Sequence, residues 1–289
     1  MNIKKPILFF QEVLMVSLSV FLGIVVASRL RESFLYEKVY SQELSATTVF
    51  LYIIIATIVI LILSKAFRKF GNFSFQAIFI LAVFGGLNIF FSIFFIPILA
   101  LVLATAFTVY RMVHPTVINH NLVIILSVAG VGGSLGLSLS PIAVVSLLIM
   151  LSVYDFIAVY KTKHMVHLAE EMIRSRAILG LIIPESLRAH GQRTHQAKPG
   201  EGFMFLGGGD VVMPTIFAVS VLPVSIYISL VIWLSSLLGF FVNHLFFTNQ
   251  TERKPMPALP MIAVFSIAGY FTYQLIAFLI WAAYNNGSF

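Results

Sequence analysis

Long runs without a charged residue constrain this chain more than any other feature. They include residues 77–110, 121–154 and 211–251, stretches of 34, 34 and 41 residues with His counted as neutral. A helix needs roughly 20 apolar residues to cross a hydrocarbon core of about 30 Å, so each run is too long for one crossing. Charged residues make up 10% of the chain, whereas soluble domains carry about 25%. The sequence therefore predicts a membrane protein built from several spanning helices.

Proline and glycine divide these runs into segments of one crossing each. Pro97 lies in the first run, a Gly- and Ser-rich stretch precedes Pro141 in the second, and Pro223 lies in the third. Such residues end or interrupt helices. The expected fold class is all-α, a polytopic membrane protein with nine transmembrane helices. The predicted spans are residues 6–28, 45–64, 76–96, 98–113, 121–138, 141–160, 203–222, 225–247 and 260–283.

A hydrophilic segment over residues 161–202 separates two groups of spans and holds seven of the 18 Lys and Arg residues. Within it, residues 165–183 have the pattern of an amphipathic surface helix, and residues 191–202 have that of a flexible loop. The predicted organisation is therefore residues 1–160 with spans one to six, the cytoplasmic loop, and residues 203–289 with spans seven to nine.

The basic residues indicate how the chain is oriented. With nine spans and the N-terminus inside, 15 of the 18 Lys and Arg residues fall on the inside. This bias is typical of the cytoplasmic side, so we expect a cytoplasmic N-terminus, an external C-terminus and a location in the cell membrane. The placement of basic residues on the cytoplasmic side also explains the net charge of +7, so this charge does not indicate nucleic-acid binding. The first apolar run, up to Ser28, is too long for a signal-peptide core and is expected to stay as a span.

The chain contains two aspartates, and both lie in apolar segments. Asp155 lies six residues before Lys161, and Asp210 lies seven residues after Phe203. With 1.5 Å per helical residue, these positions lie about 9 Å and about 10 Å from the cytoplasmic ends of spans six and seven. Ionisable residues inside a membrane are costly and mark functional sites. The two carboxyl groups are therefore expected at similar depth.

A pair of adjacent carboxyl groups is compatible with two functions. The pair can share a proton, activate a water towards a peptide carbonyl and protonate the leaving nitrogen. Alternatively, the same pair relays protons or holds cations in a proton-coupled transporter or a cation leak channel. Composition and depth favour neither function.

Three glycines, Gly207, Gly208 and Gly209, precede Asp210. The missing side chains leave space for a substrate backbone, or equally for a closely packed helix. Gly130, Gly132, Gly133 and Gly136 have different alternatives, which are close approach of a neighbouring helix or a loosely packed or kinked helix.

The last predicted span follows the sequence Pro257-Ala258-Leu259-Pro260. Proline pushes the preceding residue away from helical angles, which favours an extended backbone that can pair with an added strand. Alternatively, Pro260 is the first-turn proline of the helix.

Tyr154-Asp155, Gly207-Gly208-Gly209-Asp210 and Pro257-Ala258-Leu259 occur in this order on predicted spans six, seven and nine. Their order and placement resemble the YD, GxGD and PAL motifs of the presenilin and signal peptide peptidase family. The nine-span layout and the loop after span six agree with this resemblance. The compact chain is most similar to microbial, archaeal presenilin homologues.

The resemblance implies an intramembrane aspartyl endopeptidase that cuts transmembrane helices of other proteins without a cofactor or a metal. Asp155 and Asp210 would be catalytic, and Tyr154 would support them. Gly207 to Gly209 and Pro257 to Leu259 would bind the substrate. The inferred orientation favours single-span substrates with an external N-terminus. Gly208 stands where the family often has a larger apolar residue, which bears on side-chain preference near the scissile bond.

Three other ionisable residues are expected to have no role in the site. Glu12 is expected to reach the membrane interface. His164 and His167 lack a third ligand for a metal. Because the chain has no cysteine, disulfides and thiolate metal sites are excluded.

Overall fold

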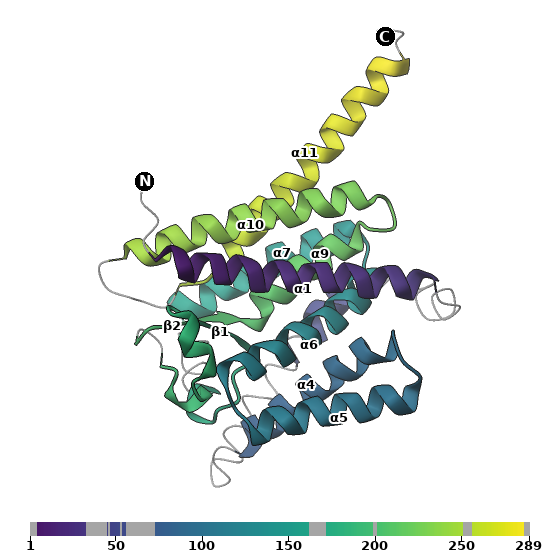
Figure 1. Ribbon diagram of the computed structural model, residues 1–289. Coiled ribbons are helices and arrows are strands. Elements are labelled where there is room, and N and C mark those ends of the chain that lie inside the picture. The colour runs from purple at the N-terminus through teal and green to yellow at the C-terminus, as the bar shows by residue number, and fades with distance from the viewer. Residues whose placement is uncertain are drawn as a thin grey trace.

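A computed structural model describes residues 5–32, 45, 47–52, 54–55, 73–161, 172–198, 201–250 and 256–285. The described residues form a bundle of helices with one small sheet at its end (Figure 1). The helices are α1 (Pro6–Glu32), α4 (Phe73–Ser92), α5 (Pro97–Val113), α6 (Val117–Leu137), α7 (Pro141–Phe156), α9 (Gly208–Ser220), α10 (Ile226–Asn249) and α11 (Leu259–Asn285). The shorter elements are the π-helical turn η2 (Ile157–Lys161), the strands β1 (Gly180–Pro184) and β2 (Phe203–Gly207), and the 3-10 helices η3 (Leu187–Gly191) and η4 (Thr194–Gln196).

The chain breaks between helices where the sequence predicts, and a proline begins the next helix. α4 ends at Ser92 and α5 begins at Pro97, while α6 ends at Leu137 and α7 begins at Pro141. Both prolines occupy the first turn of a helix, where their missing N–H costs nothing. The predicted divisions at Pro97 and before Pro141 are therefore confirmed. The third run is also divided near Pro223, between the end of α9 at Ser220 and the start of α10 at Ile226.

Six described helices are long and apolar enough to cross a membrane. The apolar helices α5 and α9 are shorter, with 17 and 13 residues. The predicted span over residues 45–64 lies largely outside the described residues, so the count of nine stays a prediction. α9 is about 20 Å long, which is less than the hydrocarbon core. Because most of its residues are buried, it lies inside the bundle rather than spanning alone.

α6 is the central helix and packs against α1, α4 and α9. A Cβ atom added at Gly132 would lie 2.7 Å from Thr215 of α9, and one at Gly133 would lie 2.7 Å from the Gly23 oxygen of α1. Glycine thus lets the backbones approach closely, and close packing, not a kink, explains this stretch. By contrast, the C-terminal half of α11 projects away from the bundle (Figure 1).

The sheet corrects three predictions. Residues 180–184 are not part of a surface helix but form β1, which pairs antiparallel with β2. Span seven does not begin as a helix at Phe203, because residues 203–207 are β2 and the helix begins at Gly208. The fold class is thus mostly helical rather than all-α. Short apolar runs such as these do not distinguish strand from helix by periodicity, and all five residues of β1 are buried.

The predicted flexible loop over residues 191–202 is also only partly right. Thr194–Gln196 forms a 3-10 helix, and the backbone of Thr116 bridges to Arg193. Of the rest of the predicted surface helix, residues 172–174 are helical and residues 175–179 are not, while residues 165–171 lie outside the described residues.

Candidate active site

Asp210 lies in the first turn of α9, immediately after β2. Gly207 is the N-cap of this helix, so Asp210 is the third residue inside it. Its carboxylate accepts a hydrogen bond from the backbone N–H of Gly207, as an acidic residue at this position of a capping box does. The positive end of the helix dipole also favours a carboxylate here. Asp210 is therefore positioned by its own segment of chain, and the predicted 10 Å of preceding helix is replaced by a strand.

Asp155 lies at the C-terminal end of a helix, whereas Asp210 lies at an N-terminal end. It precedes the last residue of α7, where the α-helix widens into the π-helical turn η2. Such turns often occur at functional sites. The half-buried carboxylate of Asp155 accepts a hydrogen bond from the backbone N–H of Leu259. Asp155 is therefore tied to a segment that is more than 100 residues away in the sequence.

The two carboxylates lie within electrostatic range of each other. The charge of Asp155 acts directly on Asp210, and the helices that carry them, α7 and α9, pack against one another. α11 contacts both helices. The fold thus brings together all three segments that the sequence singled out.

Ala258 and Leu259 are buried, with exposed fractions of 7% and 6%. Pro257 and Ala258 lie outside any helix, and α11 begins at Leu259. The helix therefore starts one residue before Pro260. Tyr154 is half-buried beside Asp155, near the end of α7.

The three glycines before Asp210 have different surroundings. A Cβ atom added at Gly207 would lie 3.0 Å from Oδ2 of Asp210, and one at Gly208 would lie 2.8 Å from the Leu179 oxygen. The N–H of Gly208 donates to that same oxygen over 2.9 Å. A Cβ atom added at Gly209 would have no neighbour within 4 Å, and Gly209 is exposed. Gly207 and Gly208 are needed for packing, while Gly209 leaves open space.

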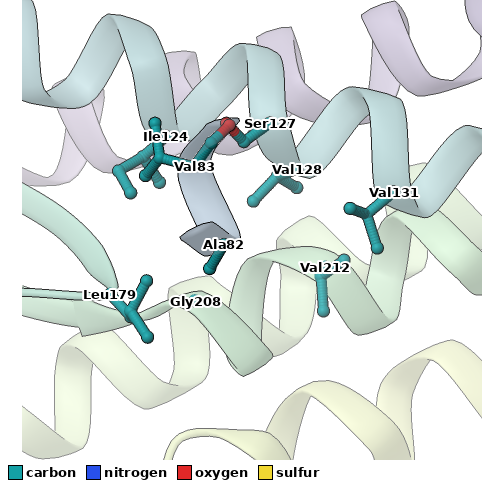
Figure 2. A pocket seen from close by; sticks show the side chains of 9 residues that line it. All are labelled: Ala82, Val83, Ile124, Ser127, Val128, Val131, Leu179, Gly208 and Val212. Carbon is teal, nitrogen blue, oxygen red and sulfur yellow. The ribbon is translucent and has the colours of Figure 1, made fainter. Parts of the chain in front are cut away.

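An apolar pocket of about 180 Å³ lies beside this turn. Figure 2 shows side chains from α4 and α6 converging on it from one side, with Leu179, Gly208 and Val212 on the other. Ser127 is the one polar side chain in its wall, and its hydroxyl donates to the Val83 carbonyl. The pocket therefore offers apolar surface close to Asp210.

A buried ionisable pair within electrostatic range of Asp210 was not expected. Glu12 is 1% exposed rather than at the interface, and its carboxylate lies 3.0 Å from Nδ1 of the fully buried His244. The charge of Glu12 also acts on Asp210. The prediction for Glu12 is wrong because α10 supplies a partner that sequence spacing does not reveal. The available signal was an ionisable residue in an apolar stretch, which favours a place inside the bundle.

Within the ranges that the structure describes, no group of three His, Asp or Glu side chains is arranged to hold a metal ion. His164 and His167 lie outside these ranges.

Comparison with known proteins shows which family the chain resembles. A family described as signal-peptide peptidase, presenilin aspartyl protease matches residues 13–280. Among curated proteins, none matches the chain.

Two solved structures share the fold, and both are described as a presenilin family intramembrane aspartate protease. The structure in space group C222 has a TM-score of 0.61 and 24% identity, and the match covers 91% of this chain and 95% of the other. The structure in space group P2 has a TM-score of 0.62 and 25% identity, with 91% and 96% covered. The family match spans nearly the whole chain, including both aspartates and Leu259, and the chain therefore belongs to the signal peptide peptidase and presenilin family of intramembrane aspartyl proteases.

Proposed function

We propose that Asp155 and Asp210 are the catalytic pair of this protease. One observation carries the proposal. Asp155 acts electrostatically on Asp210 while accepting a hydrogen bond from Leu259, so the three sequence motifs form one site. A pair held in this way provides an acid and a base on neighbouring groups.

The proposed reaction is hydrolysis of a peptide bond by water. One carboxylate takes a proton from the water, whose oxygen attacks the carbonyl carbon, and the other carboxyl group protonates the carbonyl oxygen. The tetrahedral intermediate then collapses, the C–N bond breaks and the nitrogen leaves as an amine after receiving a proton from the pair. The carboxylic acid and amine products balance the water consumed, and no covalent enzyme intermediate forms.

In the part of the chain that the structure describes, no strand pairs with the outer edge of β2, and this edge leads towards Asp210 and suits an extended substrate. A transmembrane helix must unwind before its peptide bonds reach the carboxylates, and the unwound segment then needs hydrogen-bond partners. Adding it as a strand to a sheet edge supplies these partners. The open space at Gly209 leaves room for its backbone, and the segment Pro257 to Leu259, which leads into α11, is proposed to bind the substrate beside Asp155. Gly207 and Gly208 hold the turn, and Tyr154 supports Asp155.

The apolar pocket beside Gly208 is proposed to receive an apolar side chain of the unwound segment. The pocket is lined by Gly208 and Val212, which are each two residues from Asp210 in the sequence, and this proximity supports the proposal. A transmembrane substrate provides apolar residues at almost every position, so the pocket favours large ones over small ones by burial of their surface.

The proposed substrates are single-span membrane proteins with an external N-terminus. This orientation follows from a cytoplasmic N-terminus of the enzyme in the cell membrane, for which the distribution of Lys and Arg is the support. The proposed divisions of the chain are the parts before, within and after residues 161–202.

The test uses purified protein in lipid vesicles with a single-span substrate, with and without a transition-state analogue of aspartyl proteases. The expected result is a set of peptide products, found by mass spectrometry, that the inhibitor abolishes. Ion flux through the vesicles without products would instead favour a transporter or channel and would contradict the proposal.

A further inference from the structure

The outer edge of β1, the edge away from β2, is occupied by side chains of other elements. The amide of Asn121 in α6 bonds Ile182 twice, donating to its oxygen over 2.7 Å and accepting from its N–H over 2.9 Å. His120 bonds the oxygen of Gly180 over 2.9 Å. Gln11 of α1 donates to the oxygen of Pro184 over 2.9 Å.

These contacts follow the alternation of an antiparallel ladder, in which every second residue directs its backbone groups to the same edge. Residues 180, 182 and 184 are those that face outwards, and Pro184 has no N–H to satisfy. The side chains of α6 and α1 thus bond the carbonyl of each outward residue and the N–H of Ile182, as a neighbouring strand would.

His120 is itself held in one orientation. Because a carbonyl oxygen only accepts, Nε2 of His120 carries the proton, and Nδ1 accepts from Nη2 of the buried Arg111 over 3.2 Å. Phe79 stacks on the imidazole with 5.8 Å between ring centroids, and the Arg111 guanidinium lies 4.4 Å from the Phe79 ring centre. The donor to Gly180 is therefore fixed.

Gln11 is held in a similar way. Its side-chain oxygen lies 2.7 Å from Nε2 of His190. Because an amide oxygen only accepts, Nε2 of His190 donates this hydrogen bond, and burial lowers the pKa of the imidazole. Both ends and the middle of β1 are thereby anchored to helices.

The edge of β2 is different. Phe205 pairs with Ile182, so its backbone groups point away from β1, and no partner for them is found among the described residues. At Gly207, opposite Gly180, the N–H is bonded to Asp210. A strand added to this sheet therefore has one edge to join, and that edge ends at Asp210.

We propose that His120 and Asn121 are positioning residues that replace a third strand on β1, so that the substrate joins at β2 in one register relative to Asp210. This inference rests on the proposed function. Because a slip along a strand moves every paired residue, loss of these contacts loosens the register of β1 and β2 and changes which peptide bond reaches the aspartates.

The experiment measures the ratio of products cut at different bonds of a single-span substrate. This ratio does not depend on how much enzyme is folded. Asn121→Leu removes both amide bonds, and His120→Phe removes the bond to Gly180 while keeping the ring beside Phe79. In each variant the share of the main product is expected to fall at least about twofold, with new cuts displaced by two residues, the shift that keeps side chains on their face.

Two controls separate register from general damage. Asn119→Leu removes an amide from the same helical turn that bonds His114 instead of β1. His120→Gln replaces the imidazole donor by an amide donor. Both are expected to keep the wild-type product ratio.

An unchanged ratio in both Asn121→Leu and His120→Phe would overturn the inference. If one of these two variants does not fold, the product ratio of the other tests the inference. The proposed function is tested apart from this by whether the wild-type enzyme yields inhibitor-sensitive products at all.

Discussion

Asp155 and Asp210 are held in opposite ways. Asp210 lies at the start of a helix, and the N–H that bonds its carboxylate comes from Gly207, three residues earlier. Asp155 lies at the end of a helix, and its N–H donor comes from Leu259 on α11. One carboxylate is therefore placed by local backbone geometry and the other by the packing of two distant helices.

This difference explains why three motifs are needed for the two proposed catalytic groups. The glycines before Asp210 shape the turn that holds its carboxylate. The Pro-Ala-Leu segment holds the carboxylate of Asp155, although the two are far apart in the sequence. Variants that disturb one anchor and spare the other test the comparison.

Replacement of either aspartate is expected to have the largest effect. Asp155→Asn and Asp210→Asn each remove an acid–base group, which contributes about 10²–10⁴-fold to a rate. Cleavage of a single-span substrate by purified protein is expected to fall by that factor or more in both variants, despite their different anchors. Glu201→Gln, which removes an exposed carboxylate paired with Lys198, is the matched control and is expected to cleave normally. Activity in either aspartate variant would refute the shared role.

The local anchor is tested by Gly207→Ala. The added Cβ would lie 3.0 Å from Oδ2 of Asp210 and would displace the carboxylate. Misplacement of about 1 Å can reduce a rate about 10²-fold, so kcat is expected to fall by about tenfold or more.

Gly209→Ala is the comparison variant, because its Cβ meets nothing within 4 Å. It crowds the space assigned to the substrate, so its main effect is expected on KM. Steady-state kinetics in vesicles distinguish the two, and a larger loss of kcat in Gly209→Ala would reverse the assignment.

The distant anchor is tested by Leu259→Pro. Proline is tolerated at the first position of a helix and lacks the N–H that bonds Asp155. Hydrogen bonds to charged groups contribute about 1.5–3 kcal/mol, so kcat is expected to fall about tenfold or more. Leu259→Ala shortens the same side chain but keeps the N–H, and it is expected to lose less. Equal kcat values for these two variants would show that the N–H is not what matters.

The smallest effect on activity is expected at Glu12, whose charge acts on Asp210, and at its partner His244, because both lie outside the aspartate pair. His244→Leu leaves the Glu12 carboxylate buried without this partner, and breaking a buried pair costs roughly 3–5 kcal/mol of stability. Thermal unfolding in detergent should therefore show a large loss for His244→Leu. The double variant Glu12→Leu/His244→Leu should recover much of it, and a double variant less stable than His244→Leu would contradict this account.

Sequence reasoning succeeds where a residue acts through its own chemistry. Pro97 and Pro141 begin helices because proline lacks an N–H, and the cost of an aspartate in an apolar segment marks Asp155 and Asp210 without any structure. The three motifs that the sequence selects are also the segments that meet in the fold.

Sequence reasoning fails where a distant partner decides the outcome. Residues 180–184 and 203–207 are each ambiguous alone and become strands because they pair with one another. Glu12 is buried because His244 meets it from α10. Arg111, one of the 15 basic residues assigned to the inside, is 7% exposed and bonds His120, a contact that a count of charges does not reveal.

The central claim is that carboxyl groups from α7 and α9 meet. Because the chain has no cysteine, Asp155→Cys/Asp210→Cys introduces the two thiols on their own. A specific protease site inserted between Lys198 and Glu201 then separates the two positions, and a short bifunctional thiol reagent is applied to the protein in vesicles before cleavage. The account predicts that the fragments stay joined in the double variant and separate in each single variant. Separation in the double variant, with both thiols still reacting with a monofunctional reagent, would contradict the claim.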